Sequence, residues 1–318
     1  MKCLRALERD GRITAELVEV PVPVPGPGEV LMRVHASGVN RADLSQIAGR
    51  YPPPPGESAI LGLEASGHLV GTDEPVCALL GGGGHAEFVA VPTGQLMPVP
   101  RSIDIVAAAG IPEAFLTAYV NLIVEARLVA GERALIHAGA SGVGLAAIQV
   151  ARLVGAHAAA TTRSPEKRAA MLEVGADPAI VTSEADFAEA IERAWGRDAV
   201  NVVLDPVGGT TLTSNLRILS TSGRLVVIAT MGGARSEIDL SILMKKRARV
   251  LGSTLRARLR EEKAALVTGF KGGMLHGFDT GQLRVTVDSI VTALHAGEAF
   301  QRLQDDANVG KVLIAWTQ

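Results

Sequence analysis

The stretch IHAGASGVGLAAIQVARLVGA, residues 136–156, decides the fold. An apolar run ends in a glycine-rich turn, and an Ala-rich amphipathic segment follows at once. A strand, a tight turn and a helix in that order form a phosphate cradle, because the amide groups of the first helical turn face the ligand. Such turns usually open a nucleotide-binding domain, whereas here 135 residues precede the stretch. The sequence therefore predicts a nucleotide-binding domain inserted in mid-chain.

The glycine turn fits a dinucleotide fingerprint in two frames. Gly142-x-Gly144-x-x-Ala147 is the literal frame, and Gly139-x-Ser141-x-x-Gly144 begins earlier. We favour the second frame, because Ser141 can cap the helix and the turn then follows the strand directly. A glycine-rich turn without a ligand is the alternative. The predicted cofactor-binding residues of the turn are Gly139, Ser141, Gly142, Val143 and Gly144.

Strands and helices alternate on the C-terminal side of this turn. Six apolar segments read as strands: ALIHAG, HAAATT, PAIVT, VNVVLD, GRLVVIAT and ARVLGS. Helical segments fall between them at residues 142–155, 165–174, 184–195 and 210–220, and only the last connection is unclear. Six strands joined by helical crossovers predict a doubly wound α/β domain of the Rossmann type.

The rest of the chain predicts a second domain built from both ends. Short alternating runs separated by Pro and Gly predict β structure in the first third, interrupted by the stiff loop RYPPPPG at residues 50–56. Helical spacing follows Asp104, and a basic helix and a closing strand KVLIAW follow Thr254. We expect a cofactor domain at residues 112–252 and a β-rich catalytic domain at residues 1–111 and 253–318. The active site is then expected in the cleft between the two domains.

The second strand of the cofactor domain indicates which dinucleotide binds. NAD-binding domains usually end this strand with Asp or Glu, which accepts a hydrogen bond from the ribose 2′-hydroxyl. Here HAAATTRSPEKR has no acidic residue before Glu166 and offers Arg163, Ser164 and Lys167. Basic groups attract a 2′-phosphate, so we predict NADPH, with an ordinary basic first helical turn as the alternative.

Two further segments lie where ligands bind in such sheets. Asp205 ends the fourth strand, and it either contacts the cofactor or caps the next helix. Met231 and Gly232 follow the fifth strand, where glycine permits close approach of the backbone to a ligand. All three are predicted cofactor-binding residues.

Composition excludes several other classes of protein. Hydrophobic residues make up 47% of the 318 residues and charged residues 20%, and the net charge is −2, so a globular protein without affinity for nucleic acid is expected. We expect no segment to span a bilayer, because apolar runs are short and broken. The segment MKCLRALERDG lacks a signal-peptide core, and two cysteines are typical of a cytoplasmic protein. The chain has no Gly-x-Ser-x-Gly elbow and no Cys–His grouping, so a nucleophilic hydrolase is not supported.

Several motifs resemble the zinc-free, zeta-crystallin-like quinone oxidoreductases of the medium-chain dehydrogenase/reductase superfamily. They include ASGVNRADLSQIAGRYPPPPG at residues 36–56, ILGLEASG at 60–67, IPEAFLTAY, IHAGASGVG, LDPVGG and NVGKV. The match is closest to the tumour-suppressor-inducible branch, which shares the HAG-x-SGVG turn, the MGG motif and the Leu-Arg-x-Arg run found here at residues 255–258. The segment between Gly67 and Gly81 is shorter here than the hairpin that the family usually has. The resemblance therefore does not define the substrate entrance or the oligomer contacts of this chain.

This resemblance implies a GroES-like catalytic domain and NADPH-dependent reduction of a small quinone, an ortho-quinone in our interpretation. It also implies that no catalytic metal is bound, since Asn40 and Leu63 stand where zinc enzymes of the superfamily have Cys and His. Asn40, Tyr51 and Thr117 are the expected catalytic residues, and Lys311 of NVGKV is expected near the cofactor. For Tyr51 a purely packing role is the alternative.

Two other functions stay open at this point. A related class of enzyme reduces the C=C bond of enones, with Tyr51 as the proton donor. A protein that binds NADPH as a sensor or scaffold, with little turnover, is the other. We also expect a homodimer, because the last strand of the cofactor domain is an exposed sheet edge.

Overall fold

The computed structural model describes residues 1–316, which form two compact units. Of the described residues, the first unit comprises 1–116 and 255–316, and the second comprises 117–254. Helix α2 (Pro112–Tyr119) runs through the boundary in sequence and continues as a π-helical turn at Val120–Glu125.

The second unit is built on a six-stranded parallel sheet in the order β10-β9-β8-β11-β12-β13. Its strands are β8 (Arg133–Ile136), β9 (His157–Thr162), β10 (Ala179–Val181), β11 (Val200–Asp205), β12 (Leu219–Val227) and β13 (Arg249–Gly252). The order places the first strand beside both the second and the fourth, so the chain reverses direction across the sheet there. This is the doubly wound arrangement that the alternating pattern predicted, and the α/β fold class is confirmed.

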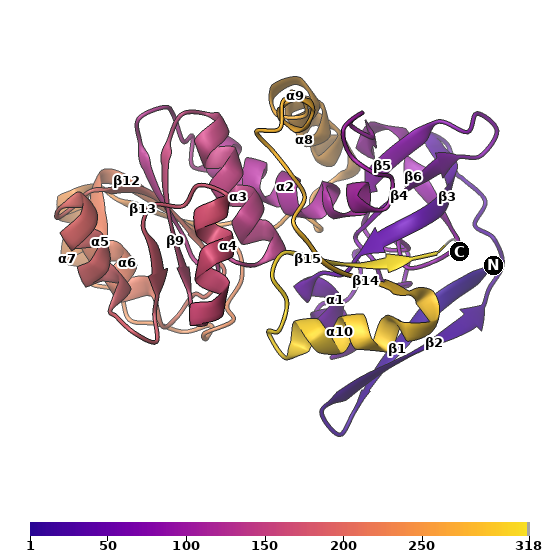
Figure 1. The fold of residues 1–318 in the computed structure, drawn as a ribbon, viewed down its shortest axis with the longest axis horizontal. Helices are drawn as coiled ribbons and strands as arrows, with labels where there is room; N and C mark the ends of the chain where they lie inside the picture. The colour runs from indigo at the N-terminus through magenta and orange to yellow at the C-terminus, as the bar shows by residue number, and fades with distance from the viewer. Residues whose placement is uncertain (317–318) are drawn as a thin grey trace. The chain divides into compact units, whose positions relative to one another are not determined.

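Helices cover both faces of this sheet (Figure 1). One face carries α3 (Gly142–Leu153) and α4 (Arg168–Glu173), which follows a 3₁₀ turn at Pro165–Lys167. The other face carries α5 (Phe187–Trp195), α6 (Leu212–Ile218) and α7 (Leu240–Lys246), whose apolar side chains pack on Leu135, Val203 and Leu225 of the sheet. Helix α7 is the connection that the sequence left unclear.

The first unit is mostly antiparallel β structure, with seven strands in one sheet. They are β3 (Glu29–Gly38), β4 (Glu64–Leu69), β5 (Pro75–Leu79), β6 (Phe88–Pro92), β7 (Leu96–Pro98), β14 (Val287–Thr292) and β15 (Lys311–Ala315). Strand β15 pairs with β3, so the C-terminal segment completes a sheet begun near the N-terminus. Both ends of the chain therefore contribute strands to this sheet.

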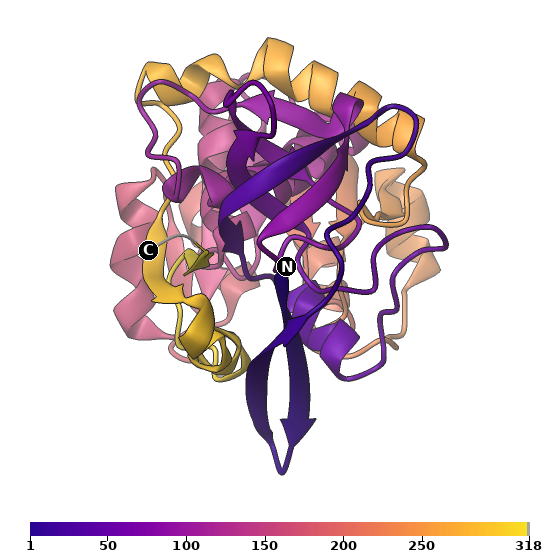
Figure 2. The same ribbon diagram turned by 90° about the vertical axis from the view of Figure 1, so that its right-hand side faces the viewer.

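Shorter elements complete the first unit. Strands β1 (Lys2–Arg9) and β2 (Arg12–Glu19) form a separate antiparallel hairpin that extends away from the larger sheet (Figure 2). The sequence analysis did not predict β1. Helices are α1 (Arg41–Ile47), α8 (Arg260–Gly273), α9 (His276–Asp279) and α10 (Ala296–Gln304), with 3₁₀ turns at Thr93–Gln95, Ala107–Gly110 and Ala293–His295.

The prediction that no segment could span a bilayer is wrong when length and composition alone are considered. Residues 107–125 form consecutive helical turns that are long and apolar enough, by length and composition, to cross a bilayer. The sequence argument relied on apolar runs being short and broken, but the helical turns continue through Gly110, Pro112 and Glu113. Within the most apolar window, 67% is buried inside the protein, as in a core helix.

Candidate active site

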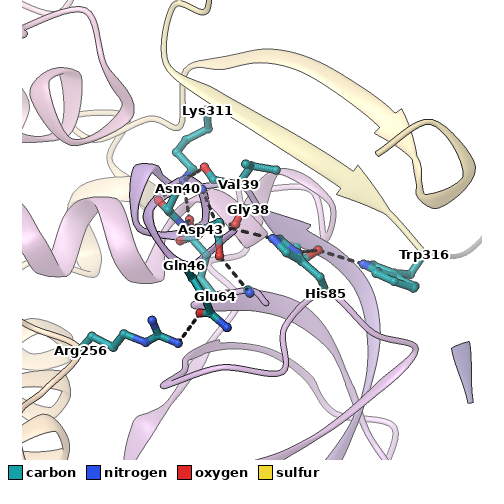
Figure 3. A network of polar contacts seen from close by, with 12 residues as sticks. Gly38, Val39, Asn40, Asp43, Gln46, Glu64, His85, Arg256, Lys311 and Trp316 are labelled. Atoms are coloured by element: carbon teal, nitrogen blue, oxygen red, sulfur yellow. Dashed lines mark hydrogen bonds and ion pairs between the residues drawn. The ribbon is translucent and has the colours of Figure 1, made fainter. Parts of the chain in front are cut away.

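A buried carboxylate organises the start of α1. Asp43 is fully buried, and its side chain accepts hydrogen bonds from the backbone N–H of Asn40 at 2.8 Å and of Gly62 at 3.0 Å. The Nε2 atom of His85 lies 3.6 Å from the same carboxylate. Asp43 therefore caps its own helix and ties it to the loop before β4 (Figure 3).

A second buried carboxylate, Glu64, forms an ion pair with Lys311. Oε1 of Glu64 lies 2.5 Å from Nζ of Lys311, and Oε2 accepts from the backbone N–H of Glu113 at 2.7 Å. The ammonium also donates to the carbonyl oxygen of Val39 at 3.1 Å. Buried charges persist only when paired in this way. A Cβ atom at Gly38 would lie 2.3 Å from Oε1, so glycine is required for the carboxylate to fit.

The side chain of Asn40 joins these groups. Its amide nitrogen donates to Glu64 at 2.9 Å and to the carbonyl oxygen of Gly38 at 3.2 Å, and its oxygen accepts from Lys311 at 2.7 Å. Both amide hydrogens are thus engaged. The structure brings two expected site residues, Asn40 and Lys311, into direct contact (Figure 3). Asn40 and Lys311 both contact Glu64 and hold it in place. Their contacts with a substrate or cofactor stay predictions.

Glu113 is a titratable group whose properties sequence reasoning did not identify. Burial and the neighbouring Glu64 together raise the pKa of its carboxyl to about 8, and Lys311 opposes the shift. The carboxyl is therefore mostly protonated at neutral pH, and a protonated carboxyl is a hydrogen-bond donor. Glu113 lies in the motif IPEAFLTAY, but its raised pKa could not be predicted from that motif, because it comes from burial and from Glu64, which is distant in sequence.

Tyr51 lies at the start of the proline-rich loop and is half-buried. Burial raises the pKa of its phenol, and Glu113 adds to that rise, whereas the Arg256 guanidinium lowers it. The guanidinium carbon of Arg256 lies 5.2 Å from the centre of the Tyr51 ring. At neutral pH the phenol is protonated and available as a donor. Thr117, the third expected catalytic residue, is half-buried in the second unit, where its carbonyl oxygen accepts from Asn121 at 2.7 Å.

The glycine turn of the second unit has the local geometry of a phosphate cradle. Ser141 caps α3, and its hydroxyl accepts from the backbone N–H of Gly144 at 3.0 Å. Cβ atoms at Gly139 and Gly144 would lie 2.6 Å from the Ala160 side chain and 2.4 Å from the carbonyl oxygen of Ala138. Amide groups of the first helical turn have no helical acceptor, so those of Gly142 and Val143 suit an anion.

The end of β9 suits a second anionic group. Arg163 is exposed and Lys167 is half-buried, and the strand ends at Thr162 without an acidic residue. The loop is fixed, because the N–H of Ser164 donates to the Thr162 hydroxyl at 3.2 Å and the Ser183 hydroxyl donates to the carbonyl oxygen of Arg163 at 2.9 Å. The residues present therefore fit a dinucleotide that carries a 2′-phosphate.

Asp205 is engaged by its own loop. One carboxylate oxygen accepts from the N–H groups of Val207 at 2.7 Å and Gly208 at 3.0 Å. The other accepts from the Thr211 hydroxyl at 2.7 Å and the Asn215 amide at 2.9 Å. Four donors satisfy the buried carboxylate, but none is a backbone N–H of α6, whose N-cap is Thr211, so Asp205 does not cap that helix. Its contact with a cofactor stays a prediction.

The loop with Met231 and Gly232 lies beside the Asp205 loop. The N–H of Gly232 donates to the carbonyl oxygen of Val207 at 2.7 Å, and a Cβ atom at Gly232 would lie 2.5 Å from the Thr210 hydroxyl. The side chain of Met231 is 50% exposed. The carboxyl ends of β11 and β12 thus carry two joined loops, the position at which ligands bind in such sheets.

The residues of the first unit do not fit a catalytic zinc ion. Zinc needs about three ligands from Cys, His, Asp and Glu, and the two expected positions carry the Asn40 amide and the buried Leu63 side chain. Glu64 is already neutralised by Lys311. Over residues 1–316, no three His, Cys, Asp or Glu side chains are grouped as a metal ion would require.

Two family models match successive parts of the chain. Residues 26–101 match the alcohol dehydrogenase GroES-like domain, and residues 142–269 match the domain described as zinc-binding dehydrogenase. Together with the doubly wound sheet, these matches define a two-domain medium-chain dehydrogenase/reductase.

Comparison with individual proteins narrows the class. The quinone oxidoreductase of Thermus thermophilus, solved alone and with NADPH, is 36% identical, with a TM-score of 0.85 over 99% of this chain and 100% of that chain. That of Escherichia coli, solved with NADPH, is 25% identical with a TM-score of 0.86 over 99% and 100%. The quinone oxidoreductase of Rattus norvegicus is 28% identical over 99% of this chain and 97% of its own. The chain belongs to the zinc-free quinone oxidoreductase family. The resemblance seen in the sequence is thereby confirmed at the family level, and the tumour-suppressor-inducible branch stays a prediction.

Proposed function

We propose that the protein is an NADPH-dependent oxidoreductase that reduces small quinones, ortho-quinones in particular, without a metal ion. One arrangement carries the proposal: in the catalytic unit the half-buried Tyr51 ring lies 5.2 Å from the Arg256 guanidinium, and burial raises the pKa of its phenol and of the Glu113 carboxyl, which favours their protonated, hydrogen-bond-donating forms. A quinone oxygen gains negative charge during reduction and accepts hydrogen bonds, so neutral donors suit it. Family membership and the NADPH complexes of two relatives support the same reaction.

We assign cofactor binding to the second unit. The amide groups of Gly142 and Val143 would hold the pyrophosphate, and Arg163 and Lys167 would hold the 2′-phosphate. When bound, NADPH supplies the reducing equivalents. Sequence and geometry both favour a phosphorylated ribose, since β9 ends without a carboxylate that would repel it.

Within the catalytic unit, Tyr51 donates a hydrogen bond to the quinone oxygen. Glu113 supplies a second protonated group whose proton leaves near pH 8. Asn40, Lys311 and Glu64 keep the surrounding charges fixed and paired. Because quinones are easily reduced, holding donor and acceptor together contributes most of the rate, an effect worth several kcal/mol.

Oxidation of NADPH with a matched panel of acceptors tests this function. The panel contains an ortho-quinone, the corresponding para-quinone and an enone of similar size. We expect turnover with quinones, and faster turnover with the ortho-quinone. Turnover of the enone alone would identify a C=C reductase, and tight NADPH binding without turnover would identify a sensor or scaffold.

We also propose a homodimer in a reducing, cytoplasmic compartment. Strand β13 is the last strand of its sheet, and Val250 on it is 40% exposed, which is a surface that proteins usually cover. Cys3 and Cys77 are free and buried, and burial raises the pKa of the Cys77 thiol to about 12, so this thiol stays protonated.

A further inference from the structure

The loop that carries Tyr51 is fixed at both ends by cations from one distant segment. We call residues 51–57 the proline arm, since Pro52 to Pro55 lie within it. Prolines cannot donate to a sheet, so the arm depends on its two ends for anchorage. Both ends contact residues that follow Leu255, about two hundred residues later in the chain.

Arg256 holds the tyrosine end. Its side chain is 3% exposed and makes three hydrogen bonds with different segments. Nε donates to the carbonyl oxygen of Gly81 at 2.8 Å, one terminal nitrogen to that of Tyr51 at 3.2 Å, and the other to the Gln46 side chain at 2.7 Å. Figure 3 shows the guanidinium reaching Gln46 near the end of α1. The same guanidinium lies over the Tyr51 ring at 5.2 Å, so the backbone and ring of Tyr51 share one partner.

Lys263, in the first turn of α8, holds the other end. Its side chain is 1% exposed, and Nζ lies 3.5 Å from Oε1 of Glu57. Arg260 lies 4.0 Å from the same oxygen. A Cβ atom at Gly81 would lie 2.2 Å from the carboxyl carbon of Glu57. The carboxylate of Glu57 therefore packs against Gly81, and the carbonyl oxygen of Gly81 accepts a hydrogen bond from Arg256. Gly81 thus contacts the anchors of both ends of the arm.

We propose that Arg256 and Lys263 are positioning residues, which hold the proline arm so that the Tyr51 phenol meets the quinone oxygen in one orientation. This inference rests on the proposed function of Tyr51. Neither cation needs to contact the substrate, because each acts through the arm. A stiff arm held at both ends presents the phenol with little further loss of conformational entropy on binding.

A spectroscopic titration tests the placement of Arg256 without any activity measurement. The chain has two tyrosines, so a Tyr119→Phe background leaves Tyr51 as the sole source of the tyrosinate absorbance band. Arg256→Met is expected to raise the titration midpoint of Tyr51, because the guanidinium lowers the pKa of the phenol. Lys271→Met removes an exposed cation from α8 and is expected to leave the midpoint unchanged. Circular dichroism at each pH confirms that the variant is folded. An unchanged midpoint in a folded Arg256→Met variant overturns the placement.

A double-mutant cycle tests the positioning itself. Arg256→Lys keeps the charge but loses the planar fork, and Lys263→Met removes the anchor at Glu57. We expect each to lower kcat/KM for the quinone about tenfold when Tyr51 is present, and by less than about twofold in the Tyr51→Phe background. Equal losses in both backgrounds overturn the proposal, since the cations then act independently of the phenol.

The two proposals fail in different ways. If no quinone of the panel supports NADPH oxidation by the unsubstituted protein, the proposed function fails. The tyrosinate titration still decides whether Arg256 holds the Tyr51 ring. If quinone turnover is present and the cycle is additive, the function stands and the positioning role is wrong.

Discussion

Removing the buried ammonium of Lys311 should destabilise the catalytic unit strongly. The ammonium is 5% exposed and contacts three oxygens, those of Glu64 at 2.5 Å, Asn40 at 2.7 Å and Val39 at 3.1 Å. Lys311→Met keeps much of the apolar stem but leaves the carboxylate of Glu64 buried and unpaired. Breaking a buried pair in this way costs about 3–5 kcal/mol, which corresponds to a fall in Tm of roughly 6–20 °C for a unit of this size.

The matched variants separate charge from packing. Lys271→Met, an exposed substitution of the same type in the same unit, is expected to stay within about 0.5 kcal/mol of the parent protein. Adding Glu64→Gln to Lys311→Met removes the orphaned charge and should recover part of the loss, because a neutral amide is less costly to bury. Urea unfolding followed by circular dichroism measures all four proteins. A Lys311→Met variant as stable as Lys271→Met, or a double variant less stable than the single one, would refute this reasoning.

Three further predictions concern the cofactor, the proton and the assembly. Arg163→Ala and Lys167→Ala should each weaken NADPH binding about tenfold or more and leave NADH binding nearly unchanged, as measured by fluorescence titration. Unfolding free energy should fall as pH rises from 4.5 to about 8, because the folded state retains the Glu113 proton after the unfolded chain has released it. Glu113→Gln should abolish this dependence, along with any loss of kcat/KM above about pH 8. Light scattering at micromolar concentration should show a dimer, and Val250→Lys on β13 should shift it toward monomer; a monomeric parent protein would reject the assembly.

The cofactor domain could be predicted from sequence because its signals are local. The turn at Gly139–Gly144 needs glycines where side chains would collide with Ala160 or the backbone, and the six strands are short apolar runs between helical segments. Helix α7 was missed because it is short and follows a glycine-rich loop, although six of its seven residues are Leu, Ile, Met or Lys and the Asp239 side chain caps it. Strand β1 was missed because its charged residues, at positions 2, 5, 8 and 9, give no regular alternation with apolar ones; it belongs to a hairpin that extends from the larger sheet.

The polar network of the catalytic unit could not be predicted in the same way. Motifs drew attention to Asn40 and Tyr51, but their partners come from remote segments: Lys311 is 271 residues from Asn40, and Arg256 is 205 residues from Tyr51. Only the sheet pairing of β15 with β3 brings Lys311 to Glu64. A Leu-Arg-x-Arg run signals a family in the sequence, and its function in holding a loop becomes visible only when Gly81, Gln46 and Tyr51 meet around one guanidinium.

The charges of this unit have a consequence for its chemistry. Lys311 neutralises Glu64, and burial favours the protonated forms of Tyr51 and Glu113, so these groups are a paired ion and two neutral donors. A free carboxylate there would repel an oxygen that is gaining negative charge, and a zinc ligand set would require deprotonated groups. A quinone needs only weak activation together with accurate placement, which neutral donors on a fixed loop provide. The arrangement is therefore better suited to an acceptor that is reduced easily than to an unactivated ketone or aldehyde, whose reduction depends on a strong Lewis acid.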